Sequence, residues 1–304
     1  MVLERLLGSL PRSTFLDEYY LKLPFSLAAT AAPWTNQVDW DLVERLLAAP
    51  GADVVVARSG QLGDSPSAAD AAQARALFAE GYTLLVRHAE RHDGGLAKLA
   101  GEFARELAGP VDVHVYATPA GQFGFGWHYD AEDVFILQAT GSKEFSLRKN
   151  TVNPWPLVET LPADMRYERE IMPIFRCTLS AGDWLYIPHG YWHQATARSD
   201  SVSLAVGVLA PSGIDALDVA RRRLLDSLPW RGRLPVRGAA GDQAALEQRD
   251  ALRETLARLG DDLARLFRDE AFAAEVIEAI SARAAGSPSP GRPAGESPPP
   301  QRPM

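Results

Sequence analysis

Two segments of the sequence carry residues whose types and spacing suit the binding of a metal ion. Residues 126–130 (GWHYD) place a histidine and an aspartate two positions apart. On an extended backbone, residues at this spacing point to the same face, so His128 and Asp130 can offer an imidazole nitrogen and a carboxylate oxygen to one ion. A third ligand must come from elsewhere in the chain, and His193, at the end of residues 182–193 (GDWLYIPHGYWH), is the candidate.

Two histidines and one carboxylate on one face of an octahedron leave three coordination positions open. This ligand set suits non-haem Fe(II), because a bidentate cosubstrate and dioxygen need the open positions. An HxD pair alone occurs often by chance. The alternative is that His128 and His193 are satisfied core residues of a barrel that holds no metal.

The elements that must position these residues lie in the middle of the chain, where the alternation typical of strands begins at Val111. Closely spaced strands joined by tight turns predict an antiparallel sandwich or barrel rather than a parallel α/β sheet. Residues 182–193 fit a hairpin that returns His193 to a position opposite His128. Strands are predicted at residues 111–116, 133–139, 143–148, 176–179, 183–187 and 201–209.

Helical patterns flank this β-rich region on both sides. Residues 1–110 are interpreted as mainly helical, with a short buried strand at 82–86 and helices at 41–49, 69–80 and 96–107. Further helices are predicted at 214–228, 244–267 and 270–285, after Pro211. The last stretch holds seven prolines in nineteen residues and is expected to be disordered. We therefore expect a domain over 1–210 with its barrel core at about 111–210, a helical module over 211–285, and a proline-rich tail over 286–304.

With its motifs placed on these elements, the sequence resembles the JmjC-type cupin oxygenases, and most of all their ribosomal-oxygenase branch. The HxD pair and the distant histidine within G-D-x-x-Y-I-P-x-G-x-x-H carry the resemblance, and residues 115–121 (VYATPAG), 133–138 (DVFILQ) and 15–24 (FLDEYYLKLP) extend it. It implies a mainly β core, a double-stranded β-helix or jelly-roll cupin barrel with flanking helices. It also implies an Fe(II) site formed by His128, Asp130 and His193, with 2-oxoglutarate as cosubstrate.

The resemblance also implies residues for the cosubstrate, whose far carboxylate needs a buried cation. Lys143, fifteen residues after His128, stands where similar oxygenases carry a basic residue for this carboxylate, although alone it would be interpreted as an exposed hairpin lysine. Tyr116 corresponds to a tyrosine that helps to bind the cosubstrate, and its alternative is a packed strand aromatic. Ser203 faces the same choice on the last strand. His114 departs from the family, in which asparagine is common at this position.

Other histidines and aromatic residues are interpreted without a direct role. Trp127 and Trp192 flank the two histidines and are interpreted as core residues rather than as walls of a substrate groove. His189 lies at a turn near the third ligand, either beside the metal site or exposed. His88 and His92 lack the His-Glu-x-x-His order and fall in a predicted loop, so both are interpreted as surface residues.

The composition excludes several classes of function. The 304 residues include 31 basic and 39 acidic ones, for a net charge of -8, which argues against a general affinity for nucleic acid or anionic membranes. Cys177 is the only cysteine, which excludes a disulfide scaffold and a zinc site built on several thiolates. Residues 1–11 lack the pattern of a secretory signal, and no stretch approaches the roughly 18 to 20 apolar residues of a membrane span. A cytoplasmic protein is expected.

The function implied by the resemblance is a 2-oxoglutarate-dependent dioxygenase that hydroxylates a side chain of a protein or peptide, with a ribosomal protein among the candidate substrates. Demethylation of an N-methylated lysine or arginine and oxidation of a peptide or natural product stay open. Relatives place a helical dimerisation module after the barrel, so residues 211–285 are expected to support a homodimer. The winged-helix domain of some relatives is expected to be absent, which weakens the assignment of a ribosomal substrate.

Two alternatives without 2-oxoglutarate also stay open. The first is a non-catalytic cupin that acts as a metal-binding scaffold or sensor, which loss of Lys143 would have favoured. The second is a cupin isomerase or dioxygenase without a keto-acid cosubstrate. Small cupins of that kind usually carry three or four histidines near the metal, whereas this sequence offers two histidines and an aspartate.

Overall fold

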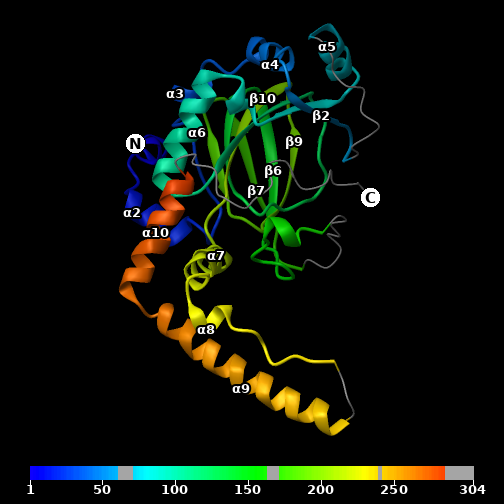
Figure 1. Cartoon of the computed structure of the whole chain (residues 1–304). Coiled ribbons are helices and arrows are strands. Elements are labelled where there is room, and N and C mark those ends of the chain that lie inside the picture. The colour runs from blue at the N-terminus through cyan, green and yellow to red at the C-terminus, as the bar shows by residue number, and fades with distance from the viewer. Residues whose placement is uncertain (61–70, 163–170, 239–241, 285–304) are drawn as a thin grey trace. The chain divides into compact units, whose positions relative to one another are not determined.

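The computed structural model describes residues 1–60, 71–162, 171–238 and 242–284. These residues form two compact units, the first of which is Met1–Ala210, while the second begins at Pro211. The first unit contains all the strands of the described chain, and the second is helical (Figure 1).

A seven-stranded antiparallel sheet forms the frame of the first unit, in the order β1-β8-β5-β10-β4-β3-β2. Its central strand, β10, is buried along its whole length and pairs with β4 on one side and β5 on the other. The strands are β1 (Phe25–Leu27), β2 (Asp53–Ala57), β3 (Thr83–Arg87), β4 (Val111–Thr118), β5 (Asp133–Thr140), β8 (Trp184–Ile187) and β10 (Ser201–Val208).

A second, three-stranded antiparallel sheet has the order β7-β6-β9. It consists of β6 (Ser142–Arg148), β7 (Phe175–Ser180) and β9 (Trp192–Ala197). The chain passes from β5 to β6 at Gly141, where φ is +65° and a Cβ would lie 2.0 Å from the carbonyl oxygen of Asp200, so only glycine fits the turn. These antiparallel, jelly-roll-like sheets with helices before and after them confirm the predicted fold class.

Alternation along the strands divides the interior into two clusters. Val113, Val115 and Ala117 of β4 join the larger cluster, which lies under the N-terminal helices. Their neighbours, Asp112, His114 and Tyr116, therefore face the other side of the sheet. On that side a smaller apolar cluster fills the space toward the second sheet, made of residues Val134, Ile136, Phe145, Leu147, Leu179, Leu185, Ile187, Tyr191 and Ala205.

The N-terminal helices pack on the outer face of the large sheet. In α6, which corresponds to the helix predicted at 96–107, Leu96, Leu99, Phe103 and Leu107 are buried, and Asp93 caps the first turn. The helical segments of this unit are α1 (Val2–Leu7), α2 (Arg12–Thr14), η1 (Phe15–Tyr19), α3 (Ala32–Thr35), α4 (Trp40–Leu47), α5 (Ala71–Ala79), η2 (Ala89–Arg91), α6 (Gly94–Leu107) and η3 (Val158–Thr160).

The sheet extends further toward the N-terminus than the expected core over residues 111–210. β3 corresponds to the strand predicted at 82–86, but β1 and β2 belong to a region that was interpreted as mainly helical. β1 has only three residues, and β2 is an apolar run of four residues after Asp53. Periodicity cannot distinguish such short runs from buried helix segments.

The second unit contains α7 (Gly213–Leu224), α8 (Leu228–Arg231), α9 (Asp242–Leu266) and α10 (Glu270–Ala284). A small core of Val219, Ala220 and Phe272 holds it together. Ser212 and Asp215 form a capping box at the start of α7, and Arg283 of α10 contacts Asp215 at 2.6 Å. The predicted disorder of residues 286–304 lies outside the described residues. Within the described ranges, no helix has both the length and the apolar character that crossing a membrane requires.

Candidate metal centre

Backbone hydrogen bonds bring the two histidines of the predicted triad together. The N–H of His128 donates to the carbonyl of His193 at 3.1 Å, and the N–H of His193 donates to the carbonyl of His128 at 2.8 Å. His128 lies in the connection between β4 and β5, and His193 lies in β9, so this bridge joins the two sheets. The two ring centroids are 4.2 Å apart.

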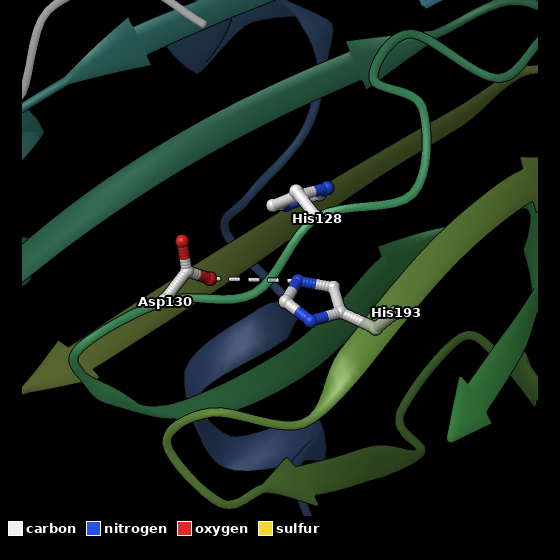
Figure 2. Close-up of side chains that lie close together, drawn as sticks. All are labelled: His128, Asp130 and His193. Carbon is white, nitrogen blue, oxygen red and sulfur yellow. Dashed lines mark ion pairs between the residues drawn. The ribbon is translucent and has the colours of Figure 1, made fainter. Parts of the chain in front are cut away.

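The third predicted ligand is held by the turn between β8 and β9. The N–H of Gly190 donates to the carbonyl of Asp130 at 2.8 Å. The Oδ2 of Asp130 lies 3.4 Å from Nε2 of His193, as the dashed line in Figure 2 shows. One ligand atom from each of His128, Asp130 and His193 lies within 4.8 Å of the others. The structure therefore places the three residues singled out by spacing around one point.

The hydrogen bonds of the two imidazoles test whether this site fits a divalent metal. The Nδ1 of His128 is 2.8 Å from the carbonyl oxygen of Gly126, and the Nδ1 of His193 is 3.0 Å from that of Tyr191. A carbonyl only accepts, so Nδ1 carries the proton in both rings and Nε2 keeps its lone pair. Burial lowers the pKa of His193, which also keeps this ring neutral. Two unprotonated nitrogens and one carboxylate oxygen fit Fe(II).

The three residues predicted for the cosubstrate also lie together. Lys143 of β6 is only 4% exposed, and its Nζ donates to Oγ of Ser203 at 3.0 Å. The same Nζ lies 5.5 Å from the ring centroid of Tyr116. Burial lowers the pKa of Lys143 to about 7, and no carboxylate pairs with it among the described residues. A buried cation without a counter-charge is a suitable partner for an incoming carboxylate.

Lys143 and the triad share one face of the small sheet. In the pairing of β6 with β9, Leu147 lies opposite His193 and Lys143 lies opposite Ala197. Residues opposite each other or four apart on a strand point to the same side, so His193 and Lys143 project in the same direction. The candidate metal ligands and the buried ammonium therefore face the same interior.

The structure corrects the interpretation of His88 as a surface residue. This histidine is not a free surface residue, because its Nδ1 lies 3.0 Å from Oδ1 of Asp112 and its N–H donates to Nδ1 of His114. The hydrogen bond to Asp112 is the main cause that raises the pKa of His88. A left-handed backbone at φ +51° turns this residue under β4, and no sequence signal marks that turn.

His88, Glu90 and Asp112 form a second group whose possible ligand atoms lie within 4.8 Å of one another. Each already has a partner in the protein, since Glu90 accepts the N–H of Val113 at 2.9 Å and Asp112 contacts His88. These hydrogen bonds account for the proximity of His88, Glu90 and Asp112 without a metal ion. His92, by contrast, is partly exposed and stays outside the group.

Two further titratable residues have shifted pKa values: His114, noted above as a departure from the family, and Glu132, which the sequence did not single out. Burial lowers the pKa of His114 to about 4, so this ring is neutral. Burial, followed by the charges of Asp112 and Asp130, raises the pKa of Glu132 to about 8. The side chain of Glu132 lies against Gly207 of β10, where a Cβ would lie 2.2 Å from Oε2, so a larger residue at position 207 would displace it.

The aromatic neighbours of the triad differ in their surroundings. Trp192 is buried and its ring packs edge-on against Tyr129 at 4.7 Å, which agrees with its interpretation as a core residue. Trp127 is partly exposed. His189 is neither a ligand nor free, since its ring Nδ1 lies 3.3 Å from Oδ2 of Asp133.

Comparison with known proteins finds a family model and relatives that match part of this chain. The model of the JmjC domain matches residues 97–216. The chain is 37% identical over 135 residues to the bifunctional lysine-specific demethylase and histidyl-hydroxylase NO66 of Dictyostelium discoideum, covering 43% of this chain and 26% of that protein. It is 34% identical over 96 residues to ribosomal oxygenase 1 of Gallus gallus, covering 32% of this chain and 16% of that protein. The matches thus span about a quarter or less of these relatives.

Solved structures of YcfD, a ribosomal oxygenase from Escherichia coli, have the same fold. The complex with cobalt and 2-oxoglutarate aligns with a TM-score of 0.55 and 20% identity over 90% of this chain and 71% of YcfD. The complex with cobalt and succinic acid aligns with a TM-score of 0.53 and 23% identity over 83% of this chain and 67% of YcfD. At this level of identity, the likeness supports the arrangement of sheets and helices.

Proposed function

We propose, from the premise that this chain is a JmjC-domain protein related to the ribosomal oxygenases, that it is an Fe(II)- and 2-oxoglutarate-dependent dioxygenase. It would hydroxylate a side chain of a protein or peptide and release succinate and CO2. The observation that carries the proposal is the pairing of two sites in one interior. An open set of two histidines and one aspartate faces the same way as a buried lysine without a carboxylate partner.

In this proposal His128, Asp130 and His193 hold the iron through two Nε2 atoms and a carboxylate oxygen. Bound iron supplies the activation of dioxygen, which amino-acid side chains cannot provide. The protein keeps both Nε2 atoms unprotonated through the carbonyls of Gly126 and Tyr191. It also leaves the remaining coordination positions without protein ligands, since the described residues within reach contribute only this triad.

Lys143, Ser203 and Tyr116 would bind the far carboxylate of 2-oxoglutarate. The ammonium of Lys143 supplies the charge. The hydroxyl of Ser203, on β10, accepts a hydrogen bond from this ammonium and so orients it. The Tyr116 ring covers the ammonium, which limits its hydration. A carboxylate that enters this position forms charge-assisted hydrogen bonds in a dry environment, where such bonds are strongest.

Anaerobic titration of the Fe(II)-loaded protein with 2-oxoglutarate tests the proposal. Chelation by the keto acid gives a metal-to-ligand charge-transfer band in the visible, and we expect a saturable band. Aerobic incubation should then convert 2-oxoglutarate to succinate. A protein that binds iron without giving either signal would instead be a metal-binding scaffold or sensor, or a cupin enzyme that uses no keto acid.

The substrate is proposed from the names of the relatives, which are described as histidyl-hydroxylases, lysine-specific demethylases and a ribosomal oxygenase. We propose a side chain of a protein, with ribosomal proteins as the first candidates to assay. Mass spectrometry separates the alternatives, because hydroxylation adds one oxygen atom and demethylation releases formaldehyde.

We also propose that the helical unit forms a homodimer through α9. None of the 25 residues of this helix is fully buried. Yet its leucines at 252, 256, 259, 263 and 266 recur at alternating spacings of four and three, as in a helix that packs on a second helix. Leu263 and Leu266 contact the small core, whereas Leu256 is 51% exposed.

Leu256→Glu is expected to weaken this dimer by at least about tenfold, since burying a leucine contributes roughly 1.5–3 kcal/mol. Sedimentation equilibrium would measure the dissociation constant. Arg258→Glu is the matched control, because two residues along a helix place it on a different face. A wild-type monomer, or equal effects of the two substitutions, would contradict the proposal.

A further inference from the structure

We propose that Asp133 is a positioning residue for the metal centre. Acting through His189, it holds the turn between β8 and β9 in the conformation that fixes Asp130 and His193. The inference rests on the proposed metal site, but it concerns a residue that neither the ligand spacing nor the comparisons assign. It begins from a carboxylate that is fully buried yet has no lysine or arginine partner among the described residues.

The carboxylate of Asp133 accepts from donors on β8 and on the following turn. Its Oδ1 accepts the hydroxyl of Tyr186 at 2.5 Å and the N–H of His189 at 3.3 Å. Its Oδ2 lies 3.3 Å from Nδ1 of His189. Burial and then the charge of Asp133 raise the pKa of Tyr186, so its hydroxyl keeps the proton that it donates. Both oxygens of Asp133 therefore contact residues of the hairpin that leads to His193.

The turn held by Asp133 contacts the metal ligands at its other end. The N–H of Gly190, next to His189, donates to the carbonyl of Asp130 at 2.8 Å. Gly190 has φ +73°, and a Cβ there would lie 2.7 Å from the carbonyl oxygen of Pro154, so the turn has little room to shift. Residues 130–133 and 188–190 are thus joined twice, by a backbone bond near the metal and by the Asp133 carboxylate behind it.

The same hairpin is also tied to the N-terminal segment. The hydroxyl of Tyr186 accepts the N–H of Leu21 at 2.8 Å, and the hydroxyl of Tyr191 donates to the carbonyl of Lys22 at 3.2 Å. Asp133 is therefore the centre of a chain of hydrogen bonds that runs from the N-terminal segment to the ligand loop. Removal of its carboxylate leaves the Tyr186 hydroxyl and the His189 N–H without their acceptor, which favours rearrangement of the turn.

The deciding measurement is Co(II) affinity, followed anaerobically by the visible bands of the bound ion. Asp133→Ala is expected to raise the dissociation constant about 10- to 100-fold, the range typical for loss of a residue that orients metal ligands. The 2-oxoglutarate concentration for half-saturation at saturating metal should change less than about threefold, because Lys143 and Ser203 lie on other strands. If Asp133 had only a structural role, Asp133→Ala would weaken Co(II) binding and 2-oxoglutarate binding to a similar extent.

Asp183→Ala is the matched control. The carboxylate of Asp183 also holds two backbone N–H groups, those of Ala29 and Ser180, both at 2.8 Å, but at the opposite end of β8. We expect this variant to lose stability without losing Co(II) affinity. Asp133→Asn keeps an acceptor for Tyr186 and the size of the side chain, so it should recover most of the wild-type affinity.

If Asp133→Ala does not fold, His189→Ala decides the question, since it removes the ring contact and keeps the carboxylate. It should weaken Co(II) binding about tenfold. Wild-type affinity in a folded Asp133→Ala or His189→Ala protein, or an equal loss in Asp183→Ala, would overturn the inference. Failure of the proposed function looks different: the wild type would bind Co(II) but give no 2-oxoglutarate signal, while the effect of Asp133 on Co(II) would remain.

Discussion

Replacing His128 or Asp130 by alanine is expected to abolish 2-oxoglutarate turnover and to weaken Fe(II) binding by more than the roughly 100-fold that loss of an orienting residue costs. Each substitution removes one of the three proposed protein ligands. The fold should survive, because the bonds that bring these loops together belong to the backbone. His128 pairs with His193, and Gly190 donates to the carbonyl of Asp130, through atoms that alanine keeps.

Anaerobic Fe(II) titration, with thermal unfolding of the metal-free proteins in parallel, checks this expectation. His92→Ala is the matched control, since it removes a partly exposed histidine that lies outside both groups of candidate ligands. Its iron affinity should equal that of the wild type. Turnover retained in both His128→Ala and Asp130→Ala would mean that the catalytic metal, if there is one, binds elsewhere. A large loss of stability would show that the ligand loops need their side chains to fold.

The grouping of His128, Asp130 and His193 could be predicted because its signals are local. His128 and Asp130 are two residues apart, and the segment that ends at His193 contains its own turns and strands. The alternation of β4 likewise fixed which side of the sheet Tyr116 faces. In each case the spacing along the chain determines on which side of a strand or turn the side chain lies, so the expected position could be read from the sequence.

The residues that were missed depend on contacts between distant parts of the chain. His88 meets Asp112 across 24 positions, and Asp133 meets His189 across 56. No local pattern specifies which loop returns beneath which strand. Lys143 is an intermediate case, because its spacing from His128 suggested its role only through the resemblance to a family. In isolation a lysine after a tight turn is usually exposed, whereas this one is buried against Ser203.

Lys143→Met should produce the second large effect, a rise of at least about 100-fold in the 2-oxoglutarate concentration needed for half-saturation. Burial of a carboxylate without a charged partner costs several kcal/mol, and about 1.4 kcal/mol corresponds to each tenfold change. Methionine keeps much of the apolar length of lysine, so the packing against Tyr116 should survive. Fe(II) affinity should stay within about threefold of the wild type, because the triad is intact. The charge-transfer titration measures both quantities, and an unchanged 2-oxoglutarate requirement would assign the far carboxylate to another residue.

The same substitution should stabilise the metal-free protein, and the dependence on pH tests the reason. Burial lowers the pKa of Lys143 to about 7, whereas an unfolded lysine keeps a pKa of about 10.4. Between these values the unfolded chain binds more protons at this residue, so its contribution to the free energy of unfolding increases as pH rises. Below about pH 7 the full cost of the buried ammonium is present, and there Lys143→Met should exceed the wild type in stability by the largest margin.

The affinity for 2-oxoglutarate should depend on pH in the opposite direction to the stability of the metal-free protein. The carboxylate of the cosubstrate favours the ammonium form, so above about pH 7 each binding event also takes up a proton, and the affinity of the wild type should fall as pH rises. Urea unfolding of both metal-free proteins from pH 6.5 to 8.5, beside 2-oxoglutarate titrations of the wild type, measures the two slopes. A stability difference between wild type and Lys143→Met that does not change with pH would show that Lys143 stays charged throughout. A buried ammonium that stays charged needs a partner within the protein, so Lys143 would then not be free to bind the far carboxylate of 2-oxoglutarate.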